Sequence, residues 1–271
     1  MRAGPVPEWA LIRRILTIDH SNRDSVVIGN FSEEMIGLYY NAGNGLFTDM
    51  APGLEIGRIS NQFLTFGCLF LDLDNDGWAD IFAANGHVQP AYDRIQPKIG
   101  YAQRPLVFRN RGATGRVDFQ EVGLASGDAL RRRILARGLA AADIDLDGDL
   151  DVALTTNNGP AILLRNDGGN GNNSIRLVLE GTKSNRSGIG AVVKVKLGHD
   201  VLRLLVRSGS SYLSQSELPL TVGLGRQPKA DGIAIHWPSG TVTKLENVTA
   251  NQIIVVNEDQ GMVRQIPLTQ S

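Results

Sequence analysis

The chain has 271 residues, which is enough for one large domain or two medium ones with a substantial core. Its formal net charge is −1, so no overall charge attracts it to nucleic acid or to an anionic membrane. No apolar run approaches the roughly 20 residues that a membrane-spanning helix needs. The single cysteine, Cys68, cannot form an internal disulfide and is expected to be a small buried apolar residue. The 31 glycines, set among short β-branched runs, indicate an all-β chain.

Residues 1–14 form an N-terminal segment with a helical pattern over residues 8–14. The segment lacks the charged head, apolar stretch and cleavage site of a signal peptide, which by itself predicts a protein that stays where it is made. A strand pattern begins at residue 15 and is followed by an acidic-looking loop at residues 19–24. Only Asp19 and Ser21 occupy ligand positions there, and Ser25 replaces a closing aspartate. We interpret this loop as a degenerate copy without a metal ion.

Two complete acidic loops, residues 72–80 and 143–151, carry aspartates at positions 1, 3, 5 and 9 and glycine at position 6. Each close pair of carboxylates costs about 1 kcal/mol even in water, so a folded chain needs a cation among them. Oxygen ligands at alternate positions suit calcium best. The expected ligands are Asp72, Asp74, Asp76, Trp78 and Asp80 in the first loop and Asp143, Asp145, Asp147, Asp149 and Asp151 in the second, with position 7 able to contribute its carbonyl.

The EF-hand is the main rival for this pattern, and the sequence argues against it. An EF-hand requires a glutamate at position 12 and two flanking helices. Ala83 and Leu154 stand at position 12, and the flanking segments are short apolar runs typical of buried strands. The loops are therefore predicted to join two strands of a hairpin. The other alternative is an acidic surface turn that holds no ion.

A strand that ends in Asn and Gly follows each acidic loop, at Asn41, Asn110 and Asn166. Such self-similarity indicates stacked β units that cannot bury their faces alone. A proline-containing insertion at residues 86–105 separates the first complete loop from its strand and is a candidate functional loop. His87, within it, is interpreted as a hydrogen-bonding anchor of that loop.

Residues 168–173 read as a linker, and the pattern changes beyond them. About seven strands alternate apolar residues with outward Lys and Arg, which favours half-exposed antiparallel sheets in a compact β-sandwich. We assign residues 15–170 to the repeated units, 173–260 to the sandwich and 261–271 to a tail.

No catalytic constellation is evident. Four serines are candidate nucleophiles that could be combined with His236 as the base: Ser210, Ser211, Ser214 and Ser216. However, none of them lies in the G-x-S-x-G elbow that is typical of such nucleophiles. The basic run at residues 131–133 has no interleaved aromatic residues, so it is interpreted as a solvated turn and not as a nucleic-acid site.

Residues 15–170 resemble the FG-GAP/VCBS repeats of calcium-binding β-propellers, through the two D-x-D-x-D-G loops and the recurrent phrase Leu/Phe-x-Arg-Asn-x-Gly. The C-terminal part resembles the ASPIC/UnbV domain through four phrases: E-G-T-K-S-N-R-S-G-I-G-A at 180–191, S-G-S-S-Y-L-S-Q-S at 208–216, G-L-G at 223–225 and W-P-S-G at 237–240. The pairing looks like the cartilage acidic protein family and its bacterial relatives.

The resemblance implies a partial β-propeller followed by the sandwich, in an extracellular or periplasmic, calcium-binding, non-catalytic recognition or adhesion protein. Its ligand would be an unknown protein or glycan. Such propellers normally have about seven blades, and two and a fraction are expected here, so missing N-terminal blades or a partner chain could complete the arc. Two alternatives remain: a carbohydrate-active or other hydrolytic enzyme that uses the propeller face, and an assembly scaffold.

Overall fold

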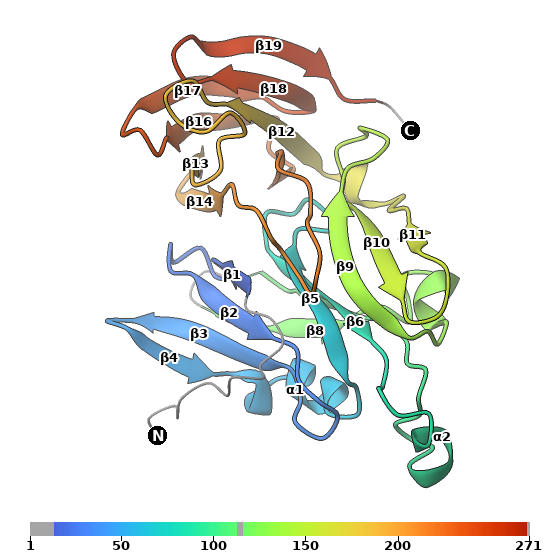
Figure 1. The fold of residues 1–271 in the computed structure, drawn as a ribbon. Coiled ribbons are helices and arrows are strands. Elements are labelled where there is room, and N and C mark those ends of the chain that lie inside the picture. The colour runs from blue at the N-terminus through green and yellow to red at the C-terminus, as the bar shows by residue number, and fades with distance from the viewer. Residues whose placement is uncertain (1–13, 113–115, 270–271) are drawn as a thin grey trace.

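The computed structural model describes residues 14–112 and 116–269. The helical pattern expected over residues 8–14 lies outside this range, except that its last residue begins a strand. Five small β-sheets in a propeller-like arrangement confirm the prediction of an all-β chain (Figure 1). Within the described ranges, no helix has the length and apolar character that crossing a membrane requires.

The first three sheets are antiparallel meanders that follow one another along the chain and form three blades. The first blade consists of β1 (Arg14–Leu16), β2 (Ser25–Ile28), β3 (Gly37–Gly43) and β4 (Leu46–Asp49). The second consists of β5 (Thr65–Leu71), β6 (Asp80–Asn85), β7 (Leu106–Asn110) and β8 (Phe119–Glu121). In the described part of the chain, the third consists of β9 (Ala136–Ala142), β10 (Asp151–Thr156) and β11 (Ile162–Leu164). The expectation of two and a fraction blades is thus too low, because the degenerate loop belongs to a four-stranded sheet.

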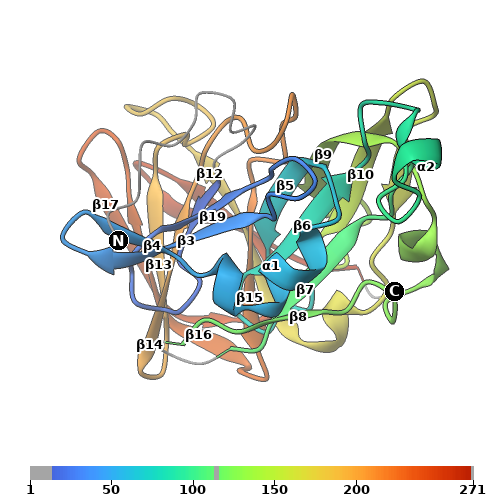
Figure 2. The same ribbon diagram turned by 90° about the horizontal axis from the view of Figure 1, so that it is seen from below.

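The second blade is covered on both faces, which explains why its strands are continuous apolar runs and do not alternate. One face packs on the first blade, where Phe70, Phe108 and Phe119 are almost completely buried. The short helices η1 (Ala51–Gly53) and α1 (Glu55–Ser60) fill the outer part of that interface. Figure 2 shows α1 beside β8, with which it is in contact.

The opposite face of the second blade packs on the third blade through a separate core. Leu69, Phe82 and Val107 meet Leu139 and Leu154 there. The connection between these two blades contains the short helix η2 (Asp128–Arg131). Cys68 is buried, as predicted, in the core between the first and second blades.

The insertion at residues 86–105 folds into a compact excursion at the outer edge of the molecule and contains the helix α2 (Tyr92–Ile95) (Figure 1). His87 stacks on Tyr92 with 3.6 Å between the ring centroids. Its Nδ1 accepts a hydrogen bond of 3.1 Å from the amide of Gln89. His87 therefore anchors this loop, as the sequence predicts.

The last two sheets face each other across one hydrophobic core and form a sandwich. One sheet has the order β15 (Leu220–Gly225), β12 (Asn173–Glu180), β18 (Gln252–Asn257) and β19 (Gly261–Pro267). The other has the order β14 (Asp200–Leu205), β13 (Val192–Leu197), β16 (Lys229–His236) and β17 (Val242–Thr249).

Three features of the sandwich differ from the sequence-based expectation. The strands β12 and β18 pair in parallel, because the chain crosses from one end of the domain to the other between them. The strands β17 and β19 lie at sheet edges, where no strand was expected. Most apolar side chains of β19 are exposed, whereas Val248 of β17 is buried in the core. The strand β19 also shows that the expected tail from residue 261 is part of a sheet.

A serine-rich segment of the sandwich covers the inner edges of the blades. Figure 1 shows the orange segment between β14 and β15 reaching toward β5. Its hydroxyls accept hydrogen bonds from edge amides, from Cys68 N to Ser211 Oγ, from Leu139 N to Ser214 Oγ and from Ala141 N to Ser216 Oγ, each of 3.1 Å. These contacts satisfy edge groups of β5 and β9 that an open arc of blades leaves unpaired. The serines therefore hold the two parts of the chain together.

Candidate metal centres

Both complete acidic loops join two strands of a blade, which confirms the predicted hairpins. The first loop connects β5 to β6, and the second connects β9 to β10. The backbone angle φ is positive at position 4 and position 6 of each loop, at Asn75 (53°), Gly77 (90°), Leu146 (62°) and Gly148 (96°). Glycine adopts such angles freely, so position 6 allows the sharp turn that the sequence predicts.

The first loop brings three carboxylates together. Asp72, Asp74 and Asp80 each offer an oxygen atom, and these atoms lie within 4.8 Å of one another. Asp72 also accepts the amides of Asp76 (3.1 Å) and Gly77 (2.9 Å), which folds the loop around its carboxylate. Asp74 Oδ1 is buried without a hydrogen-bond partner. A buried acceptor in that condition costs about 1–3 kcal/mol, which a cation in the group would remove.

The second loop repeats this arrangement. Asp143, Asp145 and Asp151 offer oxygen atoms within 4.8 Å of one another. Asp143 Oδ1 is buried without a hydrogen-bond partner, as Asp74 Oδ1 is in the first loop. Asp151 closes the loop by accepting the amides of Ile144 (3.0 Å) and Asn166 (2.8 Å).

The other residues expected as ligands in the first loop make different contacts. Asp76 accepts the amide of Trp78 at 2.9 Å through Oδ1. The indole ring of Trp78 stacks on His20, with 3.7 Å between the ring centroids. Trp78, at position 7 of the first loop, could therefore bind an ion only through its backbone carbonyl.

The corresponding residues of the second loop bind residues 168–173, the segment that leads from the blades into the sandwich. Asp147 accepts the amide of Asp149 (3.2 Å) and the side-chain amide of Asn170 (2.7 Å). Asp149 accepts the backbone amide of Asn170 at 3.1 Å. The segment that reads as a free linker thus contains a turn, η3 (Gly169–Gly171), packed against the loop.

Burial raises the pKa of several loop carboxyls. The pKa of Asp72 lies well above its usual value because of burial and the nearby charges of Asp80 and Asp76. Burial raises the pKa of Asp143 to about 6, although Arg176 partly offsets the effect. Burial and the charge of Asp147 raise the pKa of Asp149 to about 7. The ionised loops are therefore unfavourable without a positive charge among them.

These observations fit a calcium ion in each complete loop. The donors are exclusively oxygen, and each loop has two buried side-chain oxygens that lack a hydrogen-bond donor, at Asp74 and Asn75 in the first loop and at Asp143 and Asp149 in the second. The residues that would hold an ion are Asp72, Asp74 and Asp80 in the first loop and Asp143, Asp145 and Asp151 in the second. A bound ion would supply a cross-link between the strands of the hairpin.

In the degenerate loop, counted from Thr17 as position 1, the two carboxylates bind protein groups. Asp19 accepts the hydroxyl of Tyr40 at 2.8 Å and the amide of Ser21 at 3.1 Å. Asp24 pairs with Arg203 of the sandwich at 2.7 Å. This arrangement is consistent with a loop that holds no ion.

Consecutive loops are bonded to each other through the side chain at position 4. His20 Nε2, in the degenerate loop, donates to the carbonyl of Gly77 at 3.0 Å. Asn75 Nδ2, in the first complete loop, donates to the carbonyl of Gly148 at 2.9 Å. Sequence reasoning missed both residues, although the polar side chain before each turn was a usable signal.

The asparagine at or just after the end of the third strand explains the recurrent phrase in the second and third blades. Asn110 Nδ2 donates to the carbonyl of Ala79 in its own loop (3.2 Å) and to that of Ile18 in the preceding loop (2.9 Å). Asn166 Nδ2 donates to the carbonyl of Leu73 in the preceding loop (2.7 Å). The phrase therefore bonds each blade to the one before it.

An arginine accompanies each complete loop. Arg109 Nη2 lies 2.6 Å from Asp74 Oδ2 and 3.3 Å from Asp76 Oδ2. Arg176 Nη1 lies 3.3 Å from Asp143 Oδ2 and also pairs with Glu217. The alternation of the sandwich strands predicts that Arg176 points outward into solvent, but it is buried because β12 packs against the second loop.

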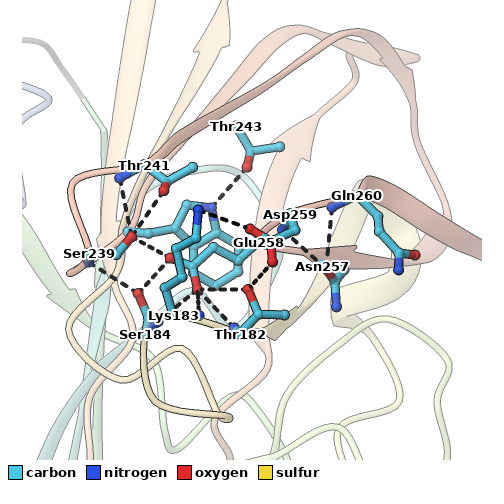
Figure 3. A network of polar contacts seen from close by, with 11 residues as sticks. Thr182, Lys183, Ser184, Ser239, Thr241, Thr243, Asn257, Glu258, Asp259 and Gln260 are labelled. Carbon is cyan, nitrogen blue, oxygen red and sulfur yellow. Dashed lines mark hydrogen bonds and ion pairs between the residues drawn. The ribbon is translucent and has the colours of Figure 1, made fainter.

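Glu258 organises the phrase at residues 180–191 of the sandwich (Figure 3). Its carboxylate accepts the backbone amides of Thr182 (2.8 Å), Lys183 (2.9 Å) and Ser184 (2.8 Å), and the hydroxyl of Ser239. Burial alone would raise the pKa of Glu258, but these hydrogen bonds outweigh it and hold the pKa at about 2. Glu258 thus joins two of the four phrases, a role that sequence reasoning missed.

Residues 181–263 match the family described as ASPIC and UnbV. The match includes three of the four phrases completely and all but the first residue of the other. A search of curated proteins found no match. The chain therefore combines a propeller-like set of blades with a C-terminal ASPIC/UnbV domain.

Proposed function

We propose that this chain is a calcium-binding, non-catalytic recognition or adhesion module whose blades are of the FG-GAP/VCBS type. The observation that carries the proposal is the matching pair of carboxylate groups, each with a buried oxygen that lacks a donor, Asp74 Oδ1 and Asp143 Oδ1. In this proposal one calcium ion clamps the hairpin of the second blade and another clamps that of the third.

The contacts between loops support a structural role for the ions. An ion in one loop fixes its turn, and the turn is bonded to the next loop through Asn75 and to the preceding loop through His20. Calcium would thereby stiffen the whole arc of blades and the surface that it presents. The serine hydroxyls, which bind edge amides of the blades, support a structural role for that segment as well.

We further propose that the module works in an extracellular or periplasmic setting and that its partner is a protein or a glycan. Extracellular calcium modules often bind with dissociation constants of roughly 10⁻⁴–10⁻³ M, which would suffice there. This part of the proposal rests on the resemblance to the cartilage acidic protein family. A glycan array and a generic hydrolase panel, both run with calcium, separate recognition from catalysis.

Thermal unfolding with calcium or EGTA tests the calcium proposal. At a free calcium concentration 100-fold above the dissociation constant, each site should stabilise the fold by about 2.7 kcal/mol. Asp74→Ala and Asp145→Ala should each remove most of the contribution of one site. Asp128→Ala is the matched control, since that side chain is 98% exposed. A melting temperature that EGTA leaves unmoved would contradict the proposal.

A further inference from the structure

A cleft of about 510 Å³ opens between the second and third blades. Its walls are apolar and include Phe82, Val107, Val122, Leu130, Val152 and Leu164. One end is polar, where Asp74, Arg109 and Arg165 line it. This volume and this lining, mostly apolar with a few polar groups, are typical of sites for small molecules.

The cleft has a structural origin in the third blade. Between the first and second blades, α1 packs against β8, the fourth strand of the second blade, and fills the outer part of the interface. The third blade has three described strands, with β11 at its edge. Among the described residues, η2 therefore has no fourth strand to pack against. Val122 and Leu164 of the cleft stay partly exposed, whereas Phe82, Val107 and Val152 form its buried floor.

Two arginines occupy equivalent positions at the polar end, each just before the asparagine of the recurrent phrase. Arg109 pairs with Asp74 and Asp76, two expected calcium ligands. Arg165 pairs with Asp167, outside the loop, at 2.6 Å. The side chain of Arg109 is 50% exposed and that of Arg165 is 63% exposed, so both can rearrange.

Calcium changes the charge at this end of the cleft. An ion held by Asp74 would bring two positive charges close to the guanidinium of Arg109 and would weaken its attraction to the same carboxylates. Arg109 would then be available to another anion, and the repulsion that the loop carboxylates exert on such an anion would fall. Arg165, which touches no loop carboxylate, would be little affected.

We propose that this cleft binds a small organic anion with an apolar body, and that calcium in the first loop promotes this binding by competing with Arg109 for Asp74. The acidic head would contact Arg109 and Arg165, because a guanidinium binds carboxylate or sulfonate groups through paired hydrogen bonds. The apolar body would lie against Leu130 and Leu164. This proposal depends on the proposed calcium site of the first loop.

The first measurement is the affinity of the first loop for a metal ion, with terbium as the probe. Trp78 is the only tryptophan within the two complete loops, so its sensitised emission reports the first loop. Arg109→Gln should raise terbium affinity roughly two- to tenfold, because a half-exposed competing charge is removed. Arg165→Gln should leave the affinity unchanged. If the wild-type chain binds neither terbium nor calcium, the proposed function fails.

The second measurement uses 1-anilinonaphthalene-8-sulfonate, an anion with an apolar body, titrated in calcium and in EGTA. The wild-type chain should bind it several-fold more tightly in calcium. Arg109→Gln should remove most of this calcium dependence, and Arg165→Gln should weaken binding in calcium. Arg111→Gln is the control, since that residue pairs with Asp118 outside the cleft lining.

Arg109→Gln should raise the affinity for terbium but lower the affinity for the naphthalene probe in calcium. A loss of folding would lower both affinities, so these opposite effects distinguish the proposal from unfolding. Equal affinity for the naphthalene probe in calcium and EGTA would overturn the proposal while leaving the calcium site intact. A calcium dependence as large in Arg109→Gln as in the wild-type chain would overturn it as well.

Discussion

We expect Asn110→Ala to destabilise the chain much more than Asn41→Ala, although both residues belong to the recurrent phrase at the third strand of a blade. Asn110 is 1% exposed, and its side chain donates to the carbonyls of Ile18 and Ala79. Its Oδ1 accepts the amide of Gly112 at 3.2 Å. The substitution leaves two buried carbonyls without this donor, at about 1–3 kcal/mol each, so the expected loss is about 3–5 kcal/mol.

Asn41 provides the matched comparison. Its side chain donates to the carbonyl of Asp24 at 3.1 Å and accepts the amide of Gly43 at 2.9 Å, and it is only partly buried. Water can replace these partners, so Asn41→Ala should cost about 1 kcal/mol. Urea unfolding with saturating calcium measures both losses. Equal losses would refute the view that the phrase bonds each blade to its predecessor.

Three further outcomes are expected. In EGTA, the melting temperature should fall as the pH rises from about 5 to 8, because the raised pKa values of Asp143 (about 6) and Asp149 (about 7) make the folded state hold more protons than the unfolded state. Calcium should flatten this pH dependence, and a flat profile in EGTA would contradict the reasoning. Leu146→Asn should raise the free energy of unfolding by roughly 0.5–1 kcal/mol, since Leu146 holds a φ of 62° that asparagine tolerates better, and no gain in urea unfolding would contradict this reasoning. Glu258→Gln should lower the melting temperature near neutral pH, because the lowered pKa of Glu258 means that its ionised carboxylate stabilises the folded state. The difference from wild type should shrink as the pH falls toward about 2, where the carboxylate takes up a proton. A difference independent of pH would point to another cause.

The local sequence was sufficient to predict the hairpins. The expected ligands of one loop lie within nine residues, and the flanking apolar runs have no alternative to pairing with each other. The structure brings Asp72, Asp74 and Asp80 together as that spacing predicts. The phrases at the C-terminus likewise located the ASPIC/UnbV domain, which the family match at residues 181–263 confirms.

The contacts between loops could not be predicted, because they join segments that are distant in sequence. Cys68 and Ser211 are separated by 143 positions, and their hydrogen bond depends on where the sandwich sits relative to the blades. The alternation of β12 marks Arg176 as outward from the core of the sandwich, but it does not reveal that the second acidic loop covers that face.

The amino-acid sequence by itself determined the β units and their acidic turns, because each depends on the order of neighbouring residues. Only the tertiary structure decided how many blades form, that β12 and β18 run parallel, and which arginine accompanies which loop. These features arise when separate units bury their apolar faces against one another, and that packing brings together charges that no local pattern relates.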